Sequence, residues 1–572
     1  MRPLARLTFR FISLATLLFA ISHAQALPTP ADLASAESAS TAWLGLVDIR
    51  RYPESYDASA PAMKSLVPRA AFEHATATIR APLGKLTKRT VKSVKAIKAP
   101  KVDSKDGFIA VEYSSSFEAL DATTESVLLT LQDGEWHPFS YAVKREGDPT
   151  PGQVRMILRD RIDTAHRGVG IVVAISDKTG RRVIAHGSTA REGGKPVDGD
   201  TLFEIGSITK VFTGLLLADA VVRGEVSLDD PVSKYLPASV KTLKAGGTDV
   251  TLLQLATHTS GLPRVPSNMA VKDSDNPYAD YTVEQLYETL NLFDHPAPVK
   301  AGVQYSNLGM GLLGHVLALR AGTNYESLLR SRVLEPLGMK DTVIALDAQK
   351  KARFARPHLA TLYPTPAWEL PALAGAGALR STANDMLKFA EAHLGKKPTA
   401  LDAAIRLALR PADAAGSQGL GWSVRNNGEL AMHTGATGGS TSYIALDNKE
   451  KRAFVVMGNS ANAIIDIGNH LFSRDQPLLY SPVQVMRKKI RLADPTAFDR
   501  YVGTYSLTSD FSITITRQGD RYFSQATSQG PFEIFPASES LFFLKALEAA
   551  LEFSTNAAGQ VTHLTLLQNG AA

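Results

Sequence analysis

The stretch Phe203-Glu204-Ile205-Gly206-Ser207-Ile208-Thr209-Lys210 places a serine three positions before a lysine, a spacing that no other lysine of the chain has. From Ile208 to Leu216, apolar residues recur at the spacing of an amphipathic helix. Three residues make nearly one helical turn, so we expect Lys210 beside Ser207 on the same side of this helix. Because Gly206 permits a tight entry, Ser207 is expected at or just inside the N-terminus of the helix.

This pair suits acyl transfer, because a serine hydroxyl becomes a good nucleophile when a neighbouring base removes its proton. Lys210 can be this base if burial or a nearby positive charge keeps its amine partly neutral. The free N–H groups at a helix start would stabilise negative charge on Ser207. The alternative is a serine N-cap followed by a surface lysine, and the pair alone leaves both interpretations open.

Two further motifs follow in the sequence: Tyr305-Ser306-Asn307, the single Tyr-x-Asn of the chain, and His433-Thr434-Gly435. With these motifs in this order, the chain resembles the serine β-lactamase and penicillin-binding DD-peptidase superfamily, which carries Ser-x-x-Lys, then Tyr-x-Asn, then Lys- or His-Thr-Gly. Three other stretches also look like the family: 257–263, 335–339 and 435–439. The resemblance implies an α/β fold of the β-lactamase/transpeptidase type, with an antiparallel sheet flanked by helices and a helical subdomain.

The resemblance also implies a catalytic role for the residues that match the first two motifs. Ser207 would be the acylated nucleophile, and Lys210 and Tyr305 would carry its proton to the leaving group. Asn307 would hold the substrate amide.

The third motif would supply the strand that binds the substrate. This strand, which would pair with the substrate and bind its carboxylate, contains His433, Thr434 and Gly435. The oxyanion hole would use the backbone N–H of Ser207 and one N–H just beyond the strand, at Ala436 or Thr437.

Tyr-x-Asn in place of Ser-Asp-Asn indicates the branch of class C β-lactamases and related peptidases and esterases. His433 departs from the class C β-lactamases, which usually carry lysine there, whereas DD-carboxypeptidases and D-aminopeptidases of the branch often carry histidine. A histidine is only partly charged at neutral pH and would hold a β-lactam carboxylate less strongly. We therefore expect an acyl-enzyme hydrolase of peptide-type amide bonds, similar to a DD-peptidase, a D-aminopeptidase or a linear-peptide hydrolase. The alternatives are a class C-like β-lactamase, a small-ester hydrolase, and a penicillin-binding sensor or scaffold without turnover.

Other kinds of chemistry find little support in the sequence. The absence of cysteine excludes disulfides, thiol nucleophiles and thiolate metal sites. The 13 histidines show no close ligand spacing, so we expect neither a metal nor another cofactor. A Gly-x-Gly-x-x-Gly match at 309–314 does not follow an apolar strand, and close helix packing explains it better than dinucleotide binding.

The length of 572 residues indicates several domains. Residues 1–26 hold three arginines, a short apolar stretch and Ala24-Gln25-Ala26, which is typical of a cleavable signal peptide, so we expect a periplasmic or secreted protein. Residues 27–147 show helical and then alternating patterns, and they indicate a small α+β domain. This domain resembles an exported domain of unknown function with a cystatin- or nuclear-transport-factor-like fold. Residues 485–572 alternate like a small antiparallel β domain.

Between these parts, residues 153–480 are expected to form the hydrolase domain. One hairpin is predicted near its start, with strands at 169–175 and 183–186. Another is predicted near its end, with strands at 443–446 and 453–457. A sheet assembled from both ends of a segment, with helices between, implies one large α/β domain.

The formal charge is +6, or +3 once Arg2, Arg6 and Arg10 are removed with the first 26 residues. Nine basic residues against Asp103 alone make the segment 80–105 strongly positive. We interpret this segment as a solvated face or as a patch that contacts an anionic envelope polymer. No aromatic residues are interleaved with it, so nucleic acid is not an expected partner. The expected substrates are a small peptide, a peptidoglycan fragment or a β-lactam, and no transmembrane segment is predicted after the signal is removed.

Overall fold

The computed structural model describes residues 28–80, 83–97, 107–118, 120–145, 149–241, 243–245, 247–293, 302–474, 476–478, 490, 492, 494–506, 508, 511–527, 529–545, 549–556 and 558–568. The predicted signal peptide at 1–26 lies outside these residues. Within them, no helix combines the length and the apolar character that a membrane crossing needs. The chain divides into two compact units, one ending at Gly147 and one beginning at Asp148.

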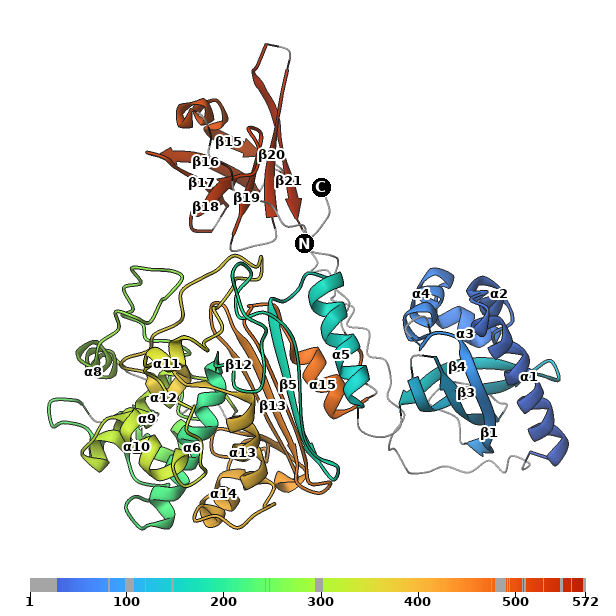
Figure 1. Ribbon diagram of the computed structural model, residues 1–572, viewed down its shortest axis with the longest axis horizontal. Helices are drawn as coiled ribbons and strands as arrows, with labels where there is room; N and C mark the ends of the chain where they lie inside the picture. Colours follow the sequence, from blue (N-terminus) through green and yellow to red (C-terminus); the bar gives the residue numbers. More distant parts are fainter. Residues whose placement is uncertain are drawn as a thin grey trace. The chain divides into compact units, whose positions relative to one another are not determined.

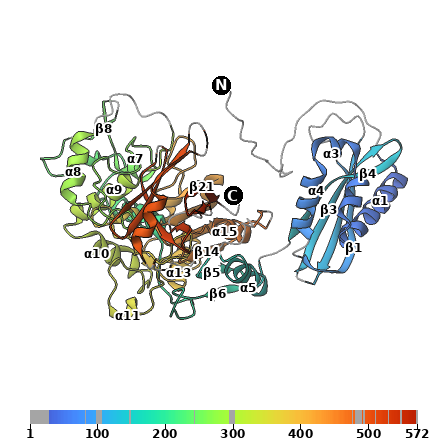
Figure 2. The same cartoon turned by 90° about the horizontal axis from the view of Figure 1, so that it is seen from above.

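The first unit consists of four helices followed by four antiparallel strands in chain order (Figure 2). The helices are α1 (Pro30–Asp48), α2 (Tyr52–Asp57), α3 (Pro61–Leu66) and α4 (Arg69–Arg80), and the strands are β1 (Leu86–Ile97), β2 (Phe108–Phe117), β3 (Leu120–Gln132) and β4 (Glu135–Arg145). Trp43, Leu44 and Val47 of α1 are buried against Ile109 and Val111 of β2. The predicted small α+β domain is thereby confirmed in fold.

Strand β1 was not predicted, because its lysines hide the strand pattern. It occupies the edge of the sheet beside β2, and its Lys88, Lys92 and Lys95 are exposed. Exposed lysines on an edge strand disfavour pairing with another chain. The positive charge of this part of the basic segment therefore has a structural explanation. Arg89 is not solvated, since it forms ion pairs with Asp48 and Glu125 at 2.7 and 2.6 Å. Contact with an anionic polymer stays a prediction.

The second unit contains a six-stranded antiparallel sheet in the order β11-β12-β13-β14-β5-β6 (Figure 1). Its strands are β5 (Gly170–Asp177), β6 (Gly180–Gly187), β11 (Ser423–Arg425), β12 (Leu430–Ala436), β13 (Thr441–Asp447) and β14 (Arg452–Gly458). Both predicted hairpins are present, and β5 pairs directly with β14. The prediction of a sheet assembled from both ends of the domain is confirmed.

Helices cover both faces of this sheet (Figure 1). One face packs against α5 (Pro151–Arg159) and α15 (Ile465–Phe472), with Ile171 and Val173 of β5 in that core. The other face, with Val172 and Ala174, contributes to a larger core with most of the remaining helices. These helices are α6 (Thr209–Val222), α7 (Leu252–Ala256), α8 (Val283–Leu292), α9 (Asn307–Ala321), α10 (Tyr325–Leu329), α12 (Ala374–Gly377), α13 (Ala383–His393) and α14 (Asp402–Leu409). The short α11 (Ala348–Lys351) has no buried residue.

Helix α6 lies at the centre of the larger core. The sequence predicts one apolar face, yet all residues from Thr209 to Ala220 are buried. Gly214 and Gly421 permit this, because the backbone around Leu420 and Lys210 lies too close for a side chain at either glycine. The helix is therefore enclosed on all sides, which removes the amine of Lys210 from water.

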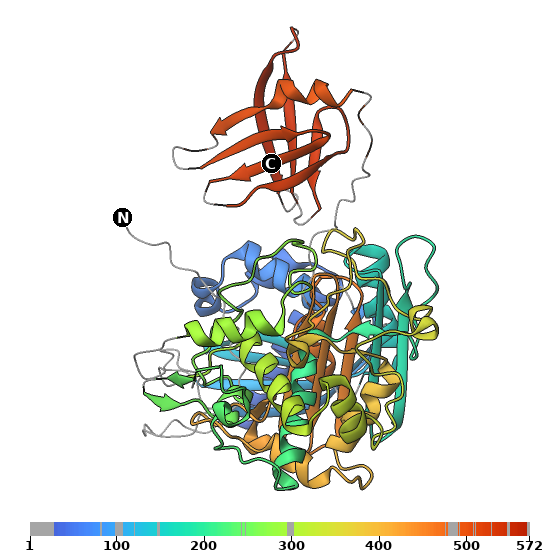
Figure 3. The ribbon, with the colours of Figure 1, turned by 90° about the vertical axis from the view of Figure 1, so that its left-hand side faces the viewer.

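Residues from 495 onward form a seven-stranded antiparallel sheet in chain order (Figure 3, red). Its strands are β15 (Gly503–Ser506), β16 (Ser512–Gln518), β17 (Arg521–Ala526), β18 (Phe532–Pro536), β19 (Leu541–Leu544), β20 (Ala549–Thr555) and β21 (Val561–Gln568). Phe498, Tyr501, Phe542 and Phe553 form an aromatic core on one face. This agrees with the predicted small antiparallel β domain. Two short strand pairs are also present: β7 (Phe203–Glu204) with β10 (Arg380–Ser381), and β8 (Lys244–Ala245) with β9 (Thr248–Asp249).

The hydrolase domain should lose stability as the pH falls from about 6.5 to 4. Burial between Phe389 and Trp422 lowers the pKa of His393 to about 4, against about 6.5 in an unfolded chain. Between these pH values His393 is protonated in the unfolded chain but not in the folded protein. This difference lowers the free energy of unfolding by about 3 kcal/mol at pH 4. His393→Gln should remove this part of the pH dependence of the free energy of unfolding, measured with urea at several pH values.

The matched control is His166→Asn, because His166 is exposed and asparagine also tolerates its positive φ of 50°. This control should retain the full pH dependence. The same pH dependence in His393→Gln and in the wild type would contradict the prediction.

Candidate active site

Ser207 and Lys210 lie together at the entry to α6, as the sequence predicts. A short 3₁₀ segment, Gly206–Ile208, precedes the helix and carries Ser207. Lys210 Nζ lies 2.9 Å from Ser207 Oγ and donates a hydrogen bond to the carbonyl of Ala376 at 2.6 Å. The lysine is fully buried while the serine remains partly exposed, so a substrate can reach the hydroxyl and water cannot surround the amine.

The environment of Lys210 suits a general base. Burial holds the pKa of Lys210 well below its usual 10.5, and the positive charge of Arg264 lowers it further. No acidic partner among the described residues forms an ion pair with this amine. A lowered pKa favours the amine form that can accept the proton of the hydroxyl. Lys210 is buried and the N-cap residue of α6 is Ile208, so the interpretation as a serine N-cap with a surface lysine is wrong.

Tyr305 completes the group around the hydroxyl. Its ring centroid lies 4.8 Å from Lys210 Nζ, 5.1 Å from the guanidinium carbon of Arg264 and 4.5 Å from the ring of His258. Burial raises the pKa of Tyr305 to about 12, although its interaction with Ser207 and the charge of Arg264 partly offset this increase. The phenol is therefore protonated at neutral pH and can donate its proton.

His258 lies next to the Tyr305 ring and contacts the backbone beside it. Its Nδ1 accepts a hydrogen bond from the backbone N–H of Ser306 at 3.1 Å, and burial lowers its pKa to about 3. A neutral imidazole that bonds to the neighbour of Tyr305 can act as a structural residue.

Asn307 begins α9 two residues after Tyr305. Its Nδ2 donates to the hydroxyl of Tyr278 at 3.2 Å, while its Oδ1 is buried without a hydrogen-bond partner among the described residues. A buried acceptor without a partner is costly unless a ligand supplies a donor. This arrangement therefore offers an acceptor for a substrate N–H. Tyr278 belongs to no recognisable motif, so the sequence did not reveal that it positions the Asn307 side chain.

Strand β12 carries the third motif and packs against the nucleophile segment. A side chain at Gly435 would collide with the carbonyl of Ile205 and the hydroxyl of Ser442. Gly206 has a φ of +48°, and a Cβ there would lie 2.8 Å from the backbone nitrogen of Ala436. Both positions therefore require glycine, and this brings Ala436 beside the residue that precedes Ser207.

The direction of the backbone groups in β12 follows from its ladder with β13. The N–H of Thr437 donates to the carbonyl of Ser440 at 2.9 Å. Because hydrogen bonding alternates along an antiparallel pair, the polar groups of Ala436 and Thr434 point away from β13. On that side β11 pairs only with residues 430–432 of β12. The outer edge of β12 is thus open at Thr434 and Ala436.

His433 differs from its expected partly charged state. Its Nδ1 lies 2.7 Å from the carbonyl of Thr434 and so carries a hydrogen, which leaves Nε2 as an acceptor. Burial and the nearby Lys210 lower the pKa of His433 to about 4. The imidazole is therefore neutral at pH 7, and β12 presents no positive charge at this position.

Glu204 joins three segments around the site and was missed from the sequence. One carboxylate oxygen accepts from the N–H of Trp368 at 2.7 Å. The other accepts from the hydroxyls of Thr437 and Ser440 at 2.8 and 3.2 Å. Burial raises the pKa of Glu204, but these bonds and the charge of Arg380 favour its ionised form. The residue fixes the turn after β12 to the strand that leads into Ser207.

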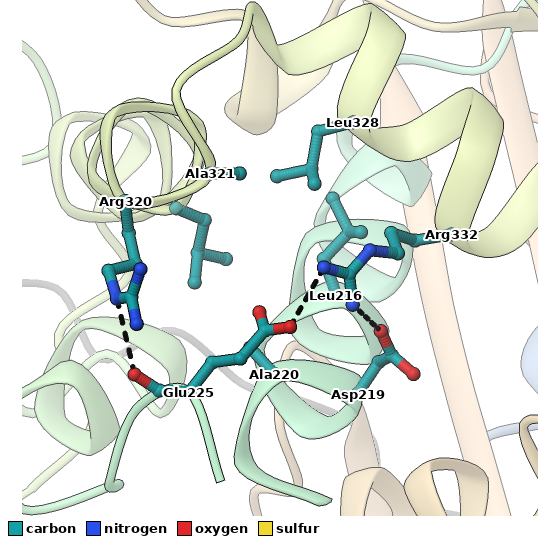
Figure 4. A pocket seen from close by; sticks show the side chains of 9 residues that line it. Leu216, Asp219, Ala220, Glu225, Arg320, Ala321, Leu328 and Arg332 are labelled. Atoms are coloured by element: carbon teal, nitrogen blue, oxygen red, sulfur yellow. Dashed lines mark hydrogen bonds and ion pairs between the residues drawn. The ribbon is translucent and has the colours of Figure 1, made fainter. Parts of the chain in front are cut away.

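A separate pocket lies near the far end of α6 (Figure 4). It is lined by Leu216, Asp219, Ala220, Glu225, Leu317, Arg320, Ala321, Leu328 and Arg332. Arg332 pairs with Asp219 and Glu225 at 3.1 and 2.8 Å, and Arg320 donates to the carbonyl of Glu225. The charges of this pocket satisfy one another, and it contains none of the predicted site residues.

Comparison with known proteins supports the family assignment that the three motifs imply. The family described as "Beta-lactamase" matches residues 156–465, while domains described as "Protein of unknown function (DUF4019)" and "Domain of unknown function (DUF3471)" match 39–141 and 487–571. The D-alanyl-D-alanine-carboxypeptidase/endopeptidase AmpH of Escherichia coli (strain K12) is 29% identical over 322 residues, which are 53% of this chain and 82% of that protein.

Two further proteins extend the comparison. A β-lactamase of Escherichia coli (strain K12) is 30% identical over 313 residues, which are 46% of this chain and 77% of that protein. A solved class C β-lactamase aligns with a TM-score of 0.50 and 23% identity over 57% of this chain and 98% of its own, and therefore shares the fold. These matches confirm the family resemblance implied by the three motifs: the protein belongs to the β-lactamase family of serine hydrolases.

Proposed function

We propose that the protein hydrolyses peptide-type amide bonds through an acyl-enzyme formed on Ser207. The observation that carries this proposal is the fully buried amine of Lys210, 2.9 Å from the Ser207 hydroxyl. Tyr305 supplies a protonated phenol beside the same hydroxyl. A nucleophile, a base whose pKa is lowered by burial and an acid therefore meet around one partly exposed oxygen.

In the first half of the reaction, Ser207 Oγ attacks the carbonyl carbon of the scissile amide while its proton passes to Lys210. The proton then moves through Tyr305 to the leaving nitrogen as the C–N bond breaks. The acyl group remains bound to Ser207 as an ester. In the second half, water attacks this ester, and a proton returns to Ser207 Oγ as the acid product leaves.

The open edge of β12 provides the remaining parts of the site. The outward N–H of Ala436, together with the N–H of Ser207, would stabilise the negative charge on the carbonyl oxygen. Thr437 is less suitable, because its N–H already bonds to Ser440. The outward N–H of Thr434 would pair with an extended substrate, since the Thr434 carbonyl already bonds to His433 Nδ1. The free Oδ1 of Asn307 would accept a substrate N–H.

A peptide is the substrate class that we favour. AmpH is named a D-alanyl-D-alanine-carboxypeptidase/endopeptidase, and the open strand edge with the free acceptor of Asn307 suits a chain with several amide groups. The neutral His433 provides no charge for the carboxylate of a β-lactam. Because another relative is named a β-lactamase, nitrocefin belongs in the same substrate panel as D-Ala-D-Ala peptides, linear peptides and p-nitrophenyl esters.

We further propose that the protein is exported, with residues 1–26 as its signal peptide. Three arginines, an apolar stretch and Ala24-Gln25-Ala26 support this assignment. We propose domain limits at 27–147, 153–480 and 485–572 for the mature chain.

Ser207→Ala should abolish turnover of every substrate in the panel, by about 10⁶-fold for the best one, because the nucleophile is lost. Mass spectrometry should detect an acyl adduct on the wild type and none on this variant. Ser331→Ala is the matched control, since its hydroxyl bonds only to the carbonyl of Leu328 within the described part of the chain. If Ser207→Ala kept even a tenth of the wild-type rate, the nucleophile assignment would be wrong.

The value of kcat/KM should decrease on the acid side of its pH profile. Ionisation of Tyr305 should cause no decrease on the alkaline side below about pH 11. Protonation of Lys210 removes the base, so the rate falls as the pH drops through its lowered pKa. Tyr305 stays protonated because its pKa is raised to about 12. The measurement uses a peptide amide from pH 5 to 10.5, and Tyr305→Phe should lower kcat about 10²- to 10⁴-fold, the usual contribution of acid–base catalysis. An alkaline decrease that disappears in Tyr305→Phe would contradict this assignment.

A further inference from the structure

Arg264 is held beside the catalytic group by its own backbone. Its carbonyl accepts hydrogen bonds from the N–H groups of Asn307 and Leu308 at 2.8 and 3.3 Å. These donors belong to the first turn of α9, whose N–H groups need partners. Its guanidinium carbon lies 5.1 Å from the centre of the Tyr305 ring. The side chain is therefore located next to the residue that protonates the leaving group.

The guanidinium of Arg264 has no partner of opposite charge. Within the described residues it forms no hydrogen bond and no ion pair, and the residue is exposed. Other arginines of the domain are paired: Arg332 with Asp219 and Glu225, and Arg161 with Asp466. An unpaired guanidinium offers five N–H donors in a planar arrangement that matches a carboxylate.

The other candidates for binding an anion at this site are neutral. His433, the cation expected on β12, has its Nδ1 hydrogen on the carbonyl of Thr434 and presents a lone pair at Nε2. A lone pair repels a carboxylate oxygen. Of the two cationic side chains that face the Tyr305 ring, Lys210 is buried and serves as the base, whereas Arg264 is exposed and offers its guanidinium to a ligand.

We propose that Arg264 binds the free C-terminal carboxylate of the peptide substrate. The family resemblance implies that the strand containing His433 binds this carboxylate, and Arg264 would do so instead. This inference rests on the proposed peptide hydrolysis and specifies in addition that the preferred peptide carries a negatively charged C-terminus. The segment that begins at Arg264 also contains Tyr278, the partner of Asn307, so one loop contacts both the amide-binding residue and the carboxylate.

The test compares two peptides that differ only in a C-terminal carboxylate or carboxamide. The wild type should prefer the carboxylate in kcat/KM. Arg264→Gln should lower kcat/KM for the carboxylate peptide about 10- to 100-fold more than for the carboxamide peptide, the range of a hydrogen bond to a charged group. A loss common to both peptides would report the effect of the Arg264 charge on Lys210. Arg264→Lys should restore part of the preference, because it returns the charge without the planar pair of donors. A second pair of peptides, with Glu or Gln inside the chain, shows whether an internal carboxylate is bound instead.

Arg223→Gln is the matched control. Arg223 follows the last residue of α6, about 24 Å from Ser207 along the helix, and its exposed guanidinium pairs with the buried Asp219. This variant should treat both peptides as the wild type does. Equal losses for both peptides in Arg264→Gln would overturn the proposal and indicate that Arg264 acts only through its charge on Lys210.

Binding to the Ser207→Ala background separates this proposal from the proposed reaction. The dissociation constants of both peptides are measured by calorimetry for Ser207→Ala and for the double variant with Arg264→Gln. Weaker binding of the carboxylate peptide alone in the double variant supports the role of Arg264, even if the wild type cleaves neither peptide. Cleavage without any carboxylate preference would instead support the hydrolase and reject the role of Arg264.

Discussion

The burial of one amine determines how this site works. Lys210 lies on a helix that is enclosed on all sides, so its ammonium form loses hydration and gains no carboxylate partner among the described residues. Burial therefore favours the neutral form, which is the one that can accept a proton from Ser207. The same burial raises the pKa of Tyr305 and lowers that of His433, which makes the first a proton donor and the second an uncharged neighbour. Enclosure of α6 is thus both a packing result and the source of the chemistry.

Precise contact between separate segments holds the groups around that amine. Gly206 and Gly435 allow β12 to touch the residues that precede Ser207, and Glu204 bonds to the turn that follows β12 and to Trp368. A carboxylate with three donors resists displacement, because each donor would lose a partner in a region without water. The backbone N–H of Ala436 is therefore fixed with respect to Ser207 before any substrate arrives, which electrostatic stabilisation requires.

The three motifs and both terminal hairpins could be predicted because local spacing and residue type carry them. Ser207, Lys210, Tyr305 and Asn307 belong to patterns with a direct physical meaning. Glu204, Tyr278 and Arg264 could not be found in this way, since their importance depends on what the fold places next to them. The charge state of His433 was also inaccessible, because the amount of burial and the distance to Lys210 are tertiary quantities. Strand β1 was missed because lysines replaced the alternating apolar residues that reveal a strand.

The order of the strands also affects how the protein reaches its folded state. Strand β5, near the start of the hydrolase domain, acquires one neighbour from β6 but the other from β14, where Ile171 pairs with Gly458. Until the chain is available through Gly458, one edge of β5 lacks its partner, and the apolar residues on both faces of the strand lack most of their cover. Contacts between residues so distant in sequence slow folding and expose an edge that can pair with other chains. The sheet of this domain can therefore close only after most of the domain's chain is available, and the open edge of β5 is exposed until then.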